Sequence, residues 1–235
     1  MRHDKGQVLD VLVGQCTQTQ VGVREVDAFA GKQLLTLALS TTLAYASPFS
    51  FSVSVDTSAL QPLPGPFWLD FLLLSGGDPL STRVEISQFS APGILVGAPV
   101  AIGVPGGVSG NLATELTLSD SGFVNEFYQQ FTPGGLLSFL VTLTPPAAIG
   151  ATPDNFSFAI LQGQPPAGIL TAGPFNELLS VDITSTSLSI GNVSTYASTD
   201  PAGVVVTATP VPEPTSMLLL GSGLIAAIAR RRRRA

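Results

Sequence analysis

The residues that could do chemistry in the middle of this chain are carboxylates and almost nothing else. Between residues 47 and 209 the sequence holds 11 acidic residues and one basic residue, Arg83, with no cysteine, histidine or lysine. A serine or cysteine nucleophile needs a base, which is usually histidine. The one histidine, His3, and the one cysteine, Cys16, both precede this segment. Triad hydrolysis, Cys/His zinc sites and lysine-dependent phosphate loops are therefore excluded from it.

Two kinds of carboxylate chemistry stay open. Glycoside hydrolysis needs two acids about 5 to 9.5 Å apart, and the segment has enough acids to supply them. Calcium prefers oxygen ligands, although the sequence has no Asp-x-Asp-x-Asp loop. Most of the acids stand singly at expected strand ends and turns, where such residues commonly bond the local backbone. We therefore expect a non-enzymatic protein without a cofactor, and the calcium alternative has five candidate ligands: Asp70, Asp78, Asp154, Asp182 and Asp200.

Carbohydrate binding is the main alternative to a purely structural role. Sandwich modules bind sugars by stacking exposed tryptophan or tyrosine rings on pyranose rings, and two aromatic residues are candidates for such a contact. Trp68 lies in an apolar run, where packing in the core competes with exposure, whereas Tyr196 lies in a polar stretch. Nucleic acid is excluded as a partner, because that affinity depends on Lys and Arg side chains that neutralise phosphates.

The elements that must position these residues are β-strands. Residues 49–56 and 82–89 alternate apolar and polar side chains, as strands with one buried face do. Residues 67–74 are more completely apolar and predict a buried strand. Further runs of strand character, separated by Gly and Pro, are 94–102, 112–118, 136–143, 156–161, 178–183, 187–193 and 204–208. This pattern predicts a single all-β domain over residues 47–209, folded as an antiparallel β-sandwich or jelly roll.

One segment departs from the strand pattern. Within residues 120–131, apolar side chains stand at 123, 124, 127, 128 and 131, which is the spacing of one helical face. Asp120 or Ser121 can cap the first turn, and Pro133-Gly134-Gly135 ends the segment. The sequence therefore predicts one short helix that closes an edge of the sandwich, with aromatic residues such as Tyr128 directed into the core.

The start of the chain has the features of an export signal. Lys32 precedes the apolar run at residues 34–43, and Ala44-Tyr45-Ala46 supplies small residues around a cleavage site after Ala46. This order predicts a secretory signal helix within residues 1–46. Residues 1–30 are then either an unusually long leader or the product of a start codon assigned too early, and we favour the second interpretation.

The end of the chain has three consecutive parts. Val211-Pro212-Glu213-Pro214 is stiff and extended, because proline cannot propagate a helix. Residues 215–229 carry no charge and predict a transmembrane helix, which at about 22 Å is short for a bilayer. Five arginines, Arg230, Arg231, Arg232, Arg233 and Arg234, then stop translocation and stay on the cytoplasmic side.

Residues 210–235 resemble the PEP-CTERM sorting signal of Gram-negative, exopolysaccharide-producing bacteria. The resemblance implies recognition by exosortase, a membrane-embedded protease-transpeptidase, with cleavage near Pro212-Glu213-Pro214. It also implies a precursor that is anchored in the inner membrane. This precursor is then released to the cell surface or into the extracellular matrix, where exopolysaccharide forms the biofilm. The alternative is an ordinary tail anchor with a basic flank.

A second resemblance covers parts of the β region. Residues 56–60, 68–71, 125–131 and 157–161 are similar to segments of an uncharacterised all-β PEP-CTERM family. That family has no assigned activity, so the resemblance implies a fold and no chemistry. The sequence thus predicts an exported, non-enzymatic surface or matrix protein, with a carbohydrate-binding module as the alternative and a glycoside hydrolase as a more remote one.

Overall fold

The computed structural model describes residues 47–77, 82–146, 152–184 and 187–212. These residues form strands and turns, with two short 3-10 helices, η1 (Ser58–Leu60) and η2 (Ile190–Asn192). The strands are β1 (Phe49–Asp56), β2 (Phe67–Leu74), β3 (Arg83–Ser90), β4 (Leu95–Ile102), β5 (Val108–Gly110), β6 (Glu115–Ser119), β7 (Val124–Phe131), β8 (Leu136–Thr144), β9 (Asp154–Gln162), β10 (Ala167–Gly168), β11 (Leu170–Thr171), β12 (Leu179–Ile183), β13 (Val193–Thr195), β14 (Ser198–Asp200) and β15 (Val205–Pro210).

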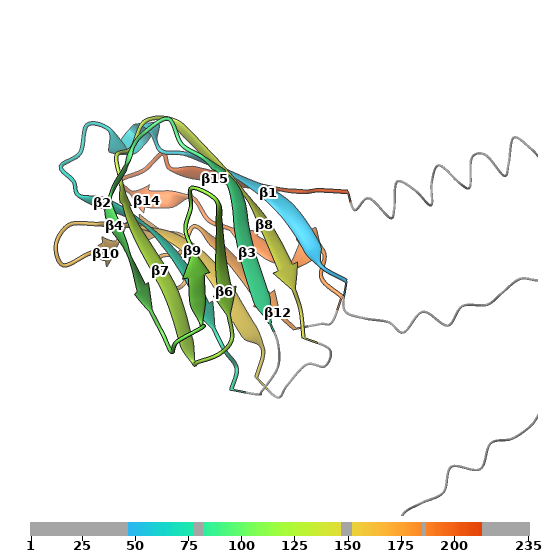
Figure 1. The fold of residues 1–235 in the computed structure, drawn as a ribbon. Coiled ribbons are helices and arrows are strands. Elements are labelled where there is room, and N and C mark those ends of the chain that lie inside the picture. Colours follow the sequence, from blue (N-terminus) through green and yellow to red (C-terminus); the bar gives the residue numbers. More distant parts are fainter. Residues whose placement is uncertain (1–46, 78–81, 147–151, 185–186, 213–235) are drawn as a thin grey trace, which may run out of the picture. The chain divides into compact units, whose positions relative to one another are not determined.

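The strands form two large antiparallel sheets that pack face to face (Figure 1). One sheet has six strands in the order β15-β1-β8-β3-β6-β5. The other has seven strands, of which six follow the order β13-β12-β9-β2-β7-β4, while β10 pairs with β9. A small two-stranded sheet joins β11 to β14. The prediction of an all-β antiparallel sandwich is confirmed.

Alternation of apolar and polar residues builds the core between the two large sheets. In β1, Phe51, Val53 and Val55 are fully buried, whereas the serines between them are half-buried on the other face. Aromatic rings join the sheets, since the ring centroids of Phe71 in β2 and Phe139 in β8 lie 5.3 Å apart in edge-to-face geometry. Burial of apolar surface is the dominant favourable contribution to folding. This core occupies one face of each sheet and leaves the other face for solvent or ligands.

The predicted helix at residues 120–131 is wrong, because this segment contains strand β7, which lies between β2 and β4. Asn125, Phe127, Gln129 and Phe131 are buried, and the residues between them are half-buried on the opposite face. Two of the four buried residues carry amides, so the strand alternation is hidden in the sequence. The amide of Gln129 is satisfied inside by donating to backbone carbonyl groups of β4 at 3.0 and 3.3 Å.

Tyr128 lies on the outward face of β7, so the prediction that its ring enters the core is wrong as well. The physical reason is the pairing of β7 with its neighbour. All eight residues of β7 are in register with β2, from Phe131 opposite Phe67 to Val124 opposite Leu74. A complete ladder of this kind overrides a weak local preference for helix.

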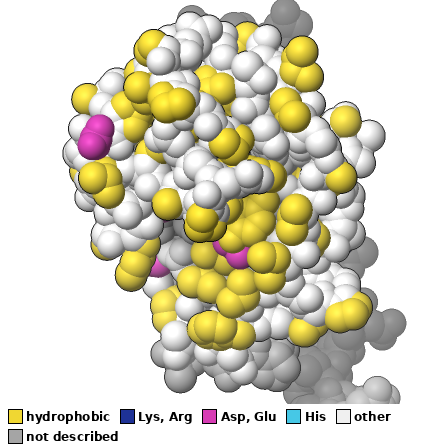
Figure 2. All heavy atoms as spheres, turned by 90° about the vertical axis from the view of Figure 1, so that its left-hand side faces the viewer, with side chains coloured by type: hydrophobic (Ala, Val, Ile, Leu, Met, Phe, Trp, Pro, Cys, Tyr) yellow, Lys and Arg dark blue, Asp and Glu magenta, His cyan; other side chains and the backbone are white. Residues whose placement is uncertain are grey.

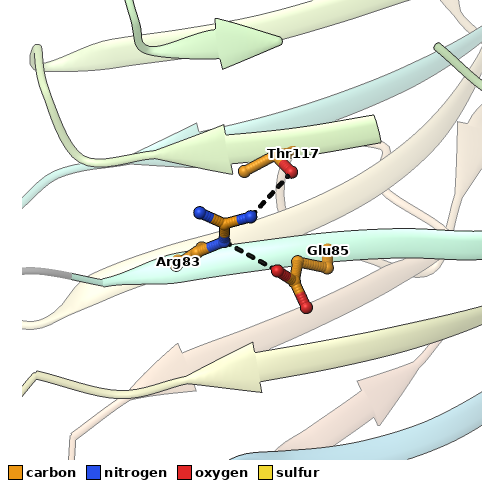
Figure 3. Close-up of polar contacts among 3 residues, drawn as sticks. All are labelled: Arg83, Glu85 and Thr117. Carbon is orange, nitrogen blue, oxygen red and sulfur yellow. Dashed lines mark hydrogen bonds and ion pairs between the residues drawn. The ribbon is translucent and has the colours of Figure 1, made fainter. Parts of the chain in front are cut away.

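The outer face of the six-stranded sheet carries Arg83, the one Lys or Arg among the described residues. Its Nε donates to Oε1 of Glu85 at 2.8 Å, and its Nη2 donates to Oγ1 of Thr117 in β6 at 3.4 Å (Figure 3). An exposed pair of this kind contributes about 0–1 kcal/mol to stability. The position of Arg83 on the six-stranded sheet has a larger consequence than this ion pair. Among the described residues, no basic side chain faces the outside of the seven-stranded sheet.

The two ends of the described β domain lie side by side (Figure 1). β1 and β15 pair in antiparallel fashion, and Phe51 near the start of β1 lies opposite Pro210 at the end of β15. The N–H of Val211 still donates to the carbonyl oxygen of Ser50 at 2.9 Å. Both chain ends therefore leave the domain at the same end of one strand pair.

Several predicted features lie outside the described residues. They are the signal helix with Ala44 and Ala46, the apolar segment at 215–229, the arginines at 230–234, Glu213 and Pro214, and the calcium candidate Asp78. Among the residues that are described, no helix is long and apolar enough to cross a bilayer.

Candidate functional site

A groove, called here the outer groove, lies on the outer face of the seven-stranded sheet. Its volume of about 520 Å³ falls in the ~300–1,000 Å³ range of small-ligand pockets. Figure 2 shows hydrophobic side chains gathered around a hollow on this side of the molecule, with acidic atoms inside it. The lining residues are Asp70, Leu72, Leu74, Asn155, Ser157, Ala159, Pro174, Phe175, Glu177, Ser180, Asp182 and Tyr196.

The floor of the outer groove follows from strand alternation in β2 and β9. Phe71 and Leu73 of β2 are fully buried in the core, so the residues between and around them face outward. The antiparallel register places three outward pairs side by side: Asp70 with Ala159, Leu72 with Ser157, and Leu74 with Asn155. Directly opposite side chains share a face of the sheet. The floor therefore combines Asp70 and two leucines on β2 with small and polar side chains on β9.

The rim of the groove includes a turn just before β12. Oε2 of Glu177 accepts a hydrogen bond from the N–H of Phe175 at 2.7 Å, and the Thr171 hydroxyl donates to the carbonyl oxygen of Glu177 at 2.8 Å. Gly173 is needed in this turn, because a Cβ there would lie 2.7 Å from the carbonyl oxygen of Glu177. The side chain of Phe175 is 88% exposed. The turn therefore presents an aromatic ring at the mouth of the groove.

Tyr196 follows β13 and lines the same groove. Its N–H donates to the carbonyl oxygen of Leu178 at 2.9 Å, which fixes its backbone beside β12. The residue is half-buried. An aromatic ring next to amide, hydroxyl and carboxylate groups offers both an apolar surface and hydrogen-bond partners to a ligand. The sugar contact predicted for Tyr196 stays a prediction, and this position is the observation behind it.

A pair of carboxyl groups lies at the floor of the groove. Asp70 is 9% exposed, and Glu126 lies diagonally opposite on β7, where the register pairs Asp70 with Tyr128 and Glu126 with Leu72. Burial, the charge of Glu126 and a hydrogen bond with Glu126 raise the pKa of Asp70 to about 8. Oδ1 of Asp70 is buried without a hydrogen-bond partner in the described chain. At neutral pH the pair therefore keeps one proton, and one buried oxygen lacks a donor.

Tyr128 belongs to the same outward row. Burial, a hydrogen bond with Glu126 and the charges of Asp70 and Glu126 raise the pKa of Tyr128 above its ordinary value. The phenol therefore stays protonated at any physiological pH and can donate to the Glu126 carboxylate.

Two further acids make the groove strongly negative. Glu177 is buried, with 5% of its surface exposed, and Asp182 is exposed on β12. Oδ1 of Asp182 accepts a hydrogen bond from Nδ2 of Asn155 at 2.8 Å. Arg83 lies on the other sheet and contacts Glu85. The described chain therefore places no cation beside these carboxylates.

Trp68 does not line the outer groove. It is half-buried in β2, on the outward side and two residues before Asp70. Its indole N–H is buried and has no hydrogen-bond partner among the described residues. The sugar contact predicted for Trp68 has no support from the lining of the groove and stays a prediction.

The candidate calcium ligands are spread over the domain. Asp70 and Asp182 line the outer groove, Asp154 begins β9, and Asp200 ends β14. Asp154 accepts hydrogen bonds from the N–H of Gly76 at 2.6 Å and from the Thr82 hydroxyl, so its carboxylate serves the local fold. Across the described ranges, no group of three or more His, Cys, Asp or Glu side chains is placed to hold a metal ion.

Sequence analysis identified Asp70, Asp182 and Tyr196 among the residues of the site and missed the others, including Glu126, Glu177 and Phe175. Glu126 was missed because the helix prediction removed its strand from the sheet. Glu177 and Phe175 were missed because they belong to a turn, although the sequence Gly173-Pro174-Phe175 is a turn signal that places a large apolar residue outside any strand.

The β domain ends where the predicted sorting segment begins. β15 ends at Pro210, and the next residues, Val211 and Pro212, are exposed. The hydrogen bond from Val211 to Ser50 extends the sheet pairing up to the residue before Pro212. The first proline of Pro212-Glu213-Pro214 is therefore accessible at the edge of a complete fold.

Residues 210–234 match the PEP-CTERM protein-sorting motif. The match confirms the predicted sorting segment and supports an exported, membrane-anchored precursor that exosortase processes. No curated protein and no solved structure matches the chain. The motif covers the tail alone and carries no information on the role of the β domain.

Proposed function

We propose that this chain is a non-enzymatic exported protein, that exosortase cuts it near Pro212-Glu213-Pro214, and that its β domain binds carbohydrate at the cell surface or in the extracellular matrix. The sorting motif at residues 210–234 is the observation behind delivery and processing. The outer groove, in which an aromatic ring lies among polar side chains, is the observation behind binding.

The end of the fold supports processing of an intact domain. β15 stops at Pro210, so a cut near Pro212-Glu213-Pro214 removes no residue of a strand. The last sheet-like hydrogen bond, from Val211 to Ser50, also lies before the motif's first proline. The domain released by such a cut keeps its complete six-stranded sheet.

Mass spectrometry of the exported protein tests the processing step. We expect the wild-type protein to lose the apolar segment at 215–229 and the arginines that follow it. Replacing all five arginines at 230–234 with serine should leave the chain unprocessed, because translocation no longer stops at the right place. The matched control Arg83→Ser removes a positive charge from the β domain and should be processed normally. An intact C-terminus in the exported wild-type protein would contradict the proposal.

The lining of the groove supports carbohydrate binding. A pyranose ring has an apolar C–H face and a rim of hydroxyl groups, and it needs both kinds of partner. Leu72 and Tyr196 supply apolar surface, whereas Asn155 and Ser180 supply hydrogen-bonding groups. Nδ2 of Asn155 donates to Oγ of Ser180 at 2.9 Å, so these polar groups are already oriented before a ligand arrives. Such preorganisation lowers the entropic cost of binding.

Affinity electrophoresis in gels that contain polysaccharides tests the binding step. We expect the exported protein to be retarded by at least one polysaccharide, and Tyr196→Ala to reduce the retardation. The control Phe123→Ala removes an aromatic ring that is 72% exposed and does not line the groove, so it should change nothing. Absence of retardation across the panel, or retardation that Tyr196→Ala leaves unchanged, counts against a carbohydrate-binding role.

An assay for catalysis separates this proposal from a glycoside hydrolase. A glycosidase needs two acids about 5 to 9.5 Å apart on either side of the scissile bond, and Asp70 with Glu126 on the neighbouring strand is the pair of the groove that has to be tested for this role. Incubation of the exported protein with any polysaccharide that retards it should release no reducing sugar. Release that disappears in Asp70→Asn would show an enzyme instead.

A further inference from the structure

We infer that the sugar bound in the outer groove carries a free ammonium group, so that the ligand class is a polysaccharide with unacetylated amino sugars. The inference rests on the proposed carbohydrate-binding function and adds the charge of the ligand to it. It is carried by the carboxylates of the groove, by the unsatisfied oxygen of Asp70, and by the position of Arg83 on the other sheet.

Among the described residues, the carboxylates of the groove have no cationic partner. Glu177 and Asp182 line the groove, and at its floor Asp70 and Glu126 hold one proton and one negative charge between them. Buried carboxylates in folded proteins are normally paired with a cation, because an isolated buried charge is costly. The guanidinium of Arg83 is held by Glu85 on the opposite sheet. A cation that enters the groove with the ligand would supply the missing partner.

Asp70 shows that the groove has an unused acceptor. The side chain is nine-tenths buried, it lines the groove, and its Oδ1 has no hydrogen-bond partner in the described part of the chain. A buried acceptor without a donor is unfavourable in the free protein, and a ligand that brings a donor removes that cost. A hydroxyl could donate to Oδ1, but an ammonium group donates as well and also neutralises the charge of the pair.

The remaining walls of the groove fit the body of a sugar. Leu72 and Leu74 form an apolar floor, and the rings of Phe175 and Tyr196 lie at its edge. Aromatic rings attract cations through their faces, in addition to stacking on C–H groups. The volume of about 520 Å³ fits a ligand of the size of one or two hexose units. The walls therefore favour a cation that is attached to a ring with an apolar face.

Other ligand charges fit the groove less well. Sugars with uronate, sulfate or phosphate groups would place like charges beside Glu177 and Asp182, which suppresses binding. A bare divalent cation would need several oxygen ligands from the protein. The described residues place no group of three or more His, Cys, Asp or Glu side chains to hold it.

Isothermal titration calorimetry of the exported protein at about pH 5.5 tests the inference, since the oxygens of the sugar lower the pKa of its amine and a mildly acidic solution keeps the amine charged. The three probes are a glucosamine oligomer, an N-acetylglucosamine oligomer and a glucose oligomer of equal length. We expect the glucosamine oligomer to bind at least about tenfold more tightly than the other two. Asp182→Asn should weaken its binding several-fold, and so should Glu126→Gln, which removes the negative charge that Glu126 places beside the protonated Asp70. Glu115→Gln removes an equivalent charge from an exposed position on β6 of the other sheet and should leave the affinity unchanged.

The outcomes separate this inference from the function on which it rests. If the acetylated or neutral oligomer binds as tightly as the charged one, and Tyr196→Ala weakens that binding, the carbohydrate-binding function stands and the ammonium inference is overturned. If none of the three oligomers binds, both are overturned. If the glucosamine oligomer binds and Glu126→Gln, Asp182→Asn and Glu115→Gln weaken its binding equally, the attraction is a diffuse one to an acidic surface, and the inference is again overturned.

Discussion

Replacing Asp70 with asparagine should make the β domain more stable at neutral and alkaline pH. Asp70 is 9% exposed, and its pKa in the folded chain is about 8, compared with an ordinary value of 3.8. Burial is the largest cause, followed by the charge of Glu126 and the hydrogen bond between the two side chains. In the unfolded chain this carboxyl group ionises near its ordinary pKa. Unfolding at neutral pH therefore releases a proton, which favours the unfolded state.

The magnitude follows from the two pKa values. Below pH 3.8 Asp70 is protonated in both states and contributes its full stability, whereas between pH 3.8 and 8 only the unfolded state ionises. The free energy of unfolding must then fall as the pH rises. Each pKa unit corresponds to about 1.36 kcal/mol, so this group accounts for a loss of at most about 4 kcal/mol between pH 5 and 8.

Fluorescence of Trp68 during urea unfolding measures this effect, because Trp68 is the one tryptophan and lies two residues from Asp70 in β2. The free energy of unfolding of the wild-type protein should fall from pH 5 to pH 8. The Asp70→Asn profile should be flatter by up to about 4 kcal/mol, since an amide does not ionise and can still donate to Glu126.

Asp56→Asn is the matched control for this measurement. Asp56 is exposed, and hydrogen bonds from the side chain and the N–H of Ser58 hold its pKa below the ordinary value. It is therefore ionised in both states above pH 5, and its replacement should leave the slope between pH 5 and 8 unchanged. Parallel profiles for Asp70→Asn and the wild-type protein would show instead that Asp70 holds no proton in the folded chain at neutral pH.

Two other substitutions test the core and the rim of the groove. Phe139→Ala should lower the free energy of unfolding by about 3–5 kcal/mol in urea titrations, because the ring is 2% exposed between the two sheets; a loss as small as that of the exposed-site control Phe123→Ala would contradict this packing. Gly173→Ala should weaken retardation by polysaccharide, because the new Cβ would lie 2.7 Å from the carbonyl oxygen of Glu177 and displace the turn that carries Phe175. Retardation equal to that of the wild-type protein would show that the turn does not contribute to binding.

Strands whose buried face is purely apolar could be predicted from the sequence. In β1 the buried residues are Phe51, Val53 and Val55, so the alternation with serine is visible in the sequence. In β7 the buried positions include Asn125 and Gln129, whose amides find partners only after β4 and the preceding turn have formed. A buried side chain whose amide donates to backbone carbonyl groups has the same residue type as an exposed one. The sequence pattern therefore assigned Asn125 and Gln129 to the surface and did not predict β7 as a strand.

The groove could be predicted only in part, for a related reason. Tyr196 was identified because an aromatic residue in a polar stretch is visible without knowledge of the fold. The pair formed by Asp70 and Glu126 depends on β2 and β7 being neighbours in one exact register, and strand order is not encoded in local spacing. The exposure of Phe175 depends on the carboxylate of Glu177 bonding back to its own turn.

The end of β15 that leads to the sorting motif and the proposed binding groove belong to different sheets of the same domain. The chain ends leave from β1 and β15 in the six-stranded sheet, whereas the outer groove opens on the outer face of the seven-stranded sheet. The fold between them is complete before Pro212, so the groove does not depend on whether the tail has been cut. A membrane-anchored precursor and a released domain should therefore bind the same ligand. In that case exosortase changes where the ligand is held, and the affinity of the groove stays the same.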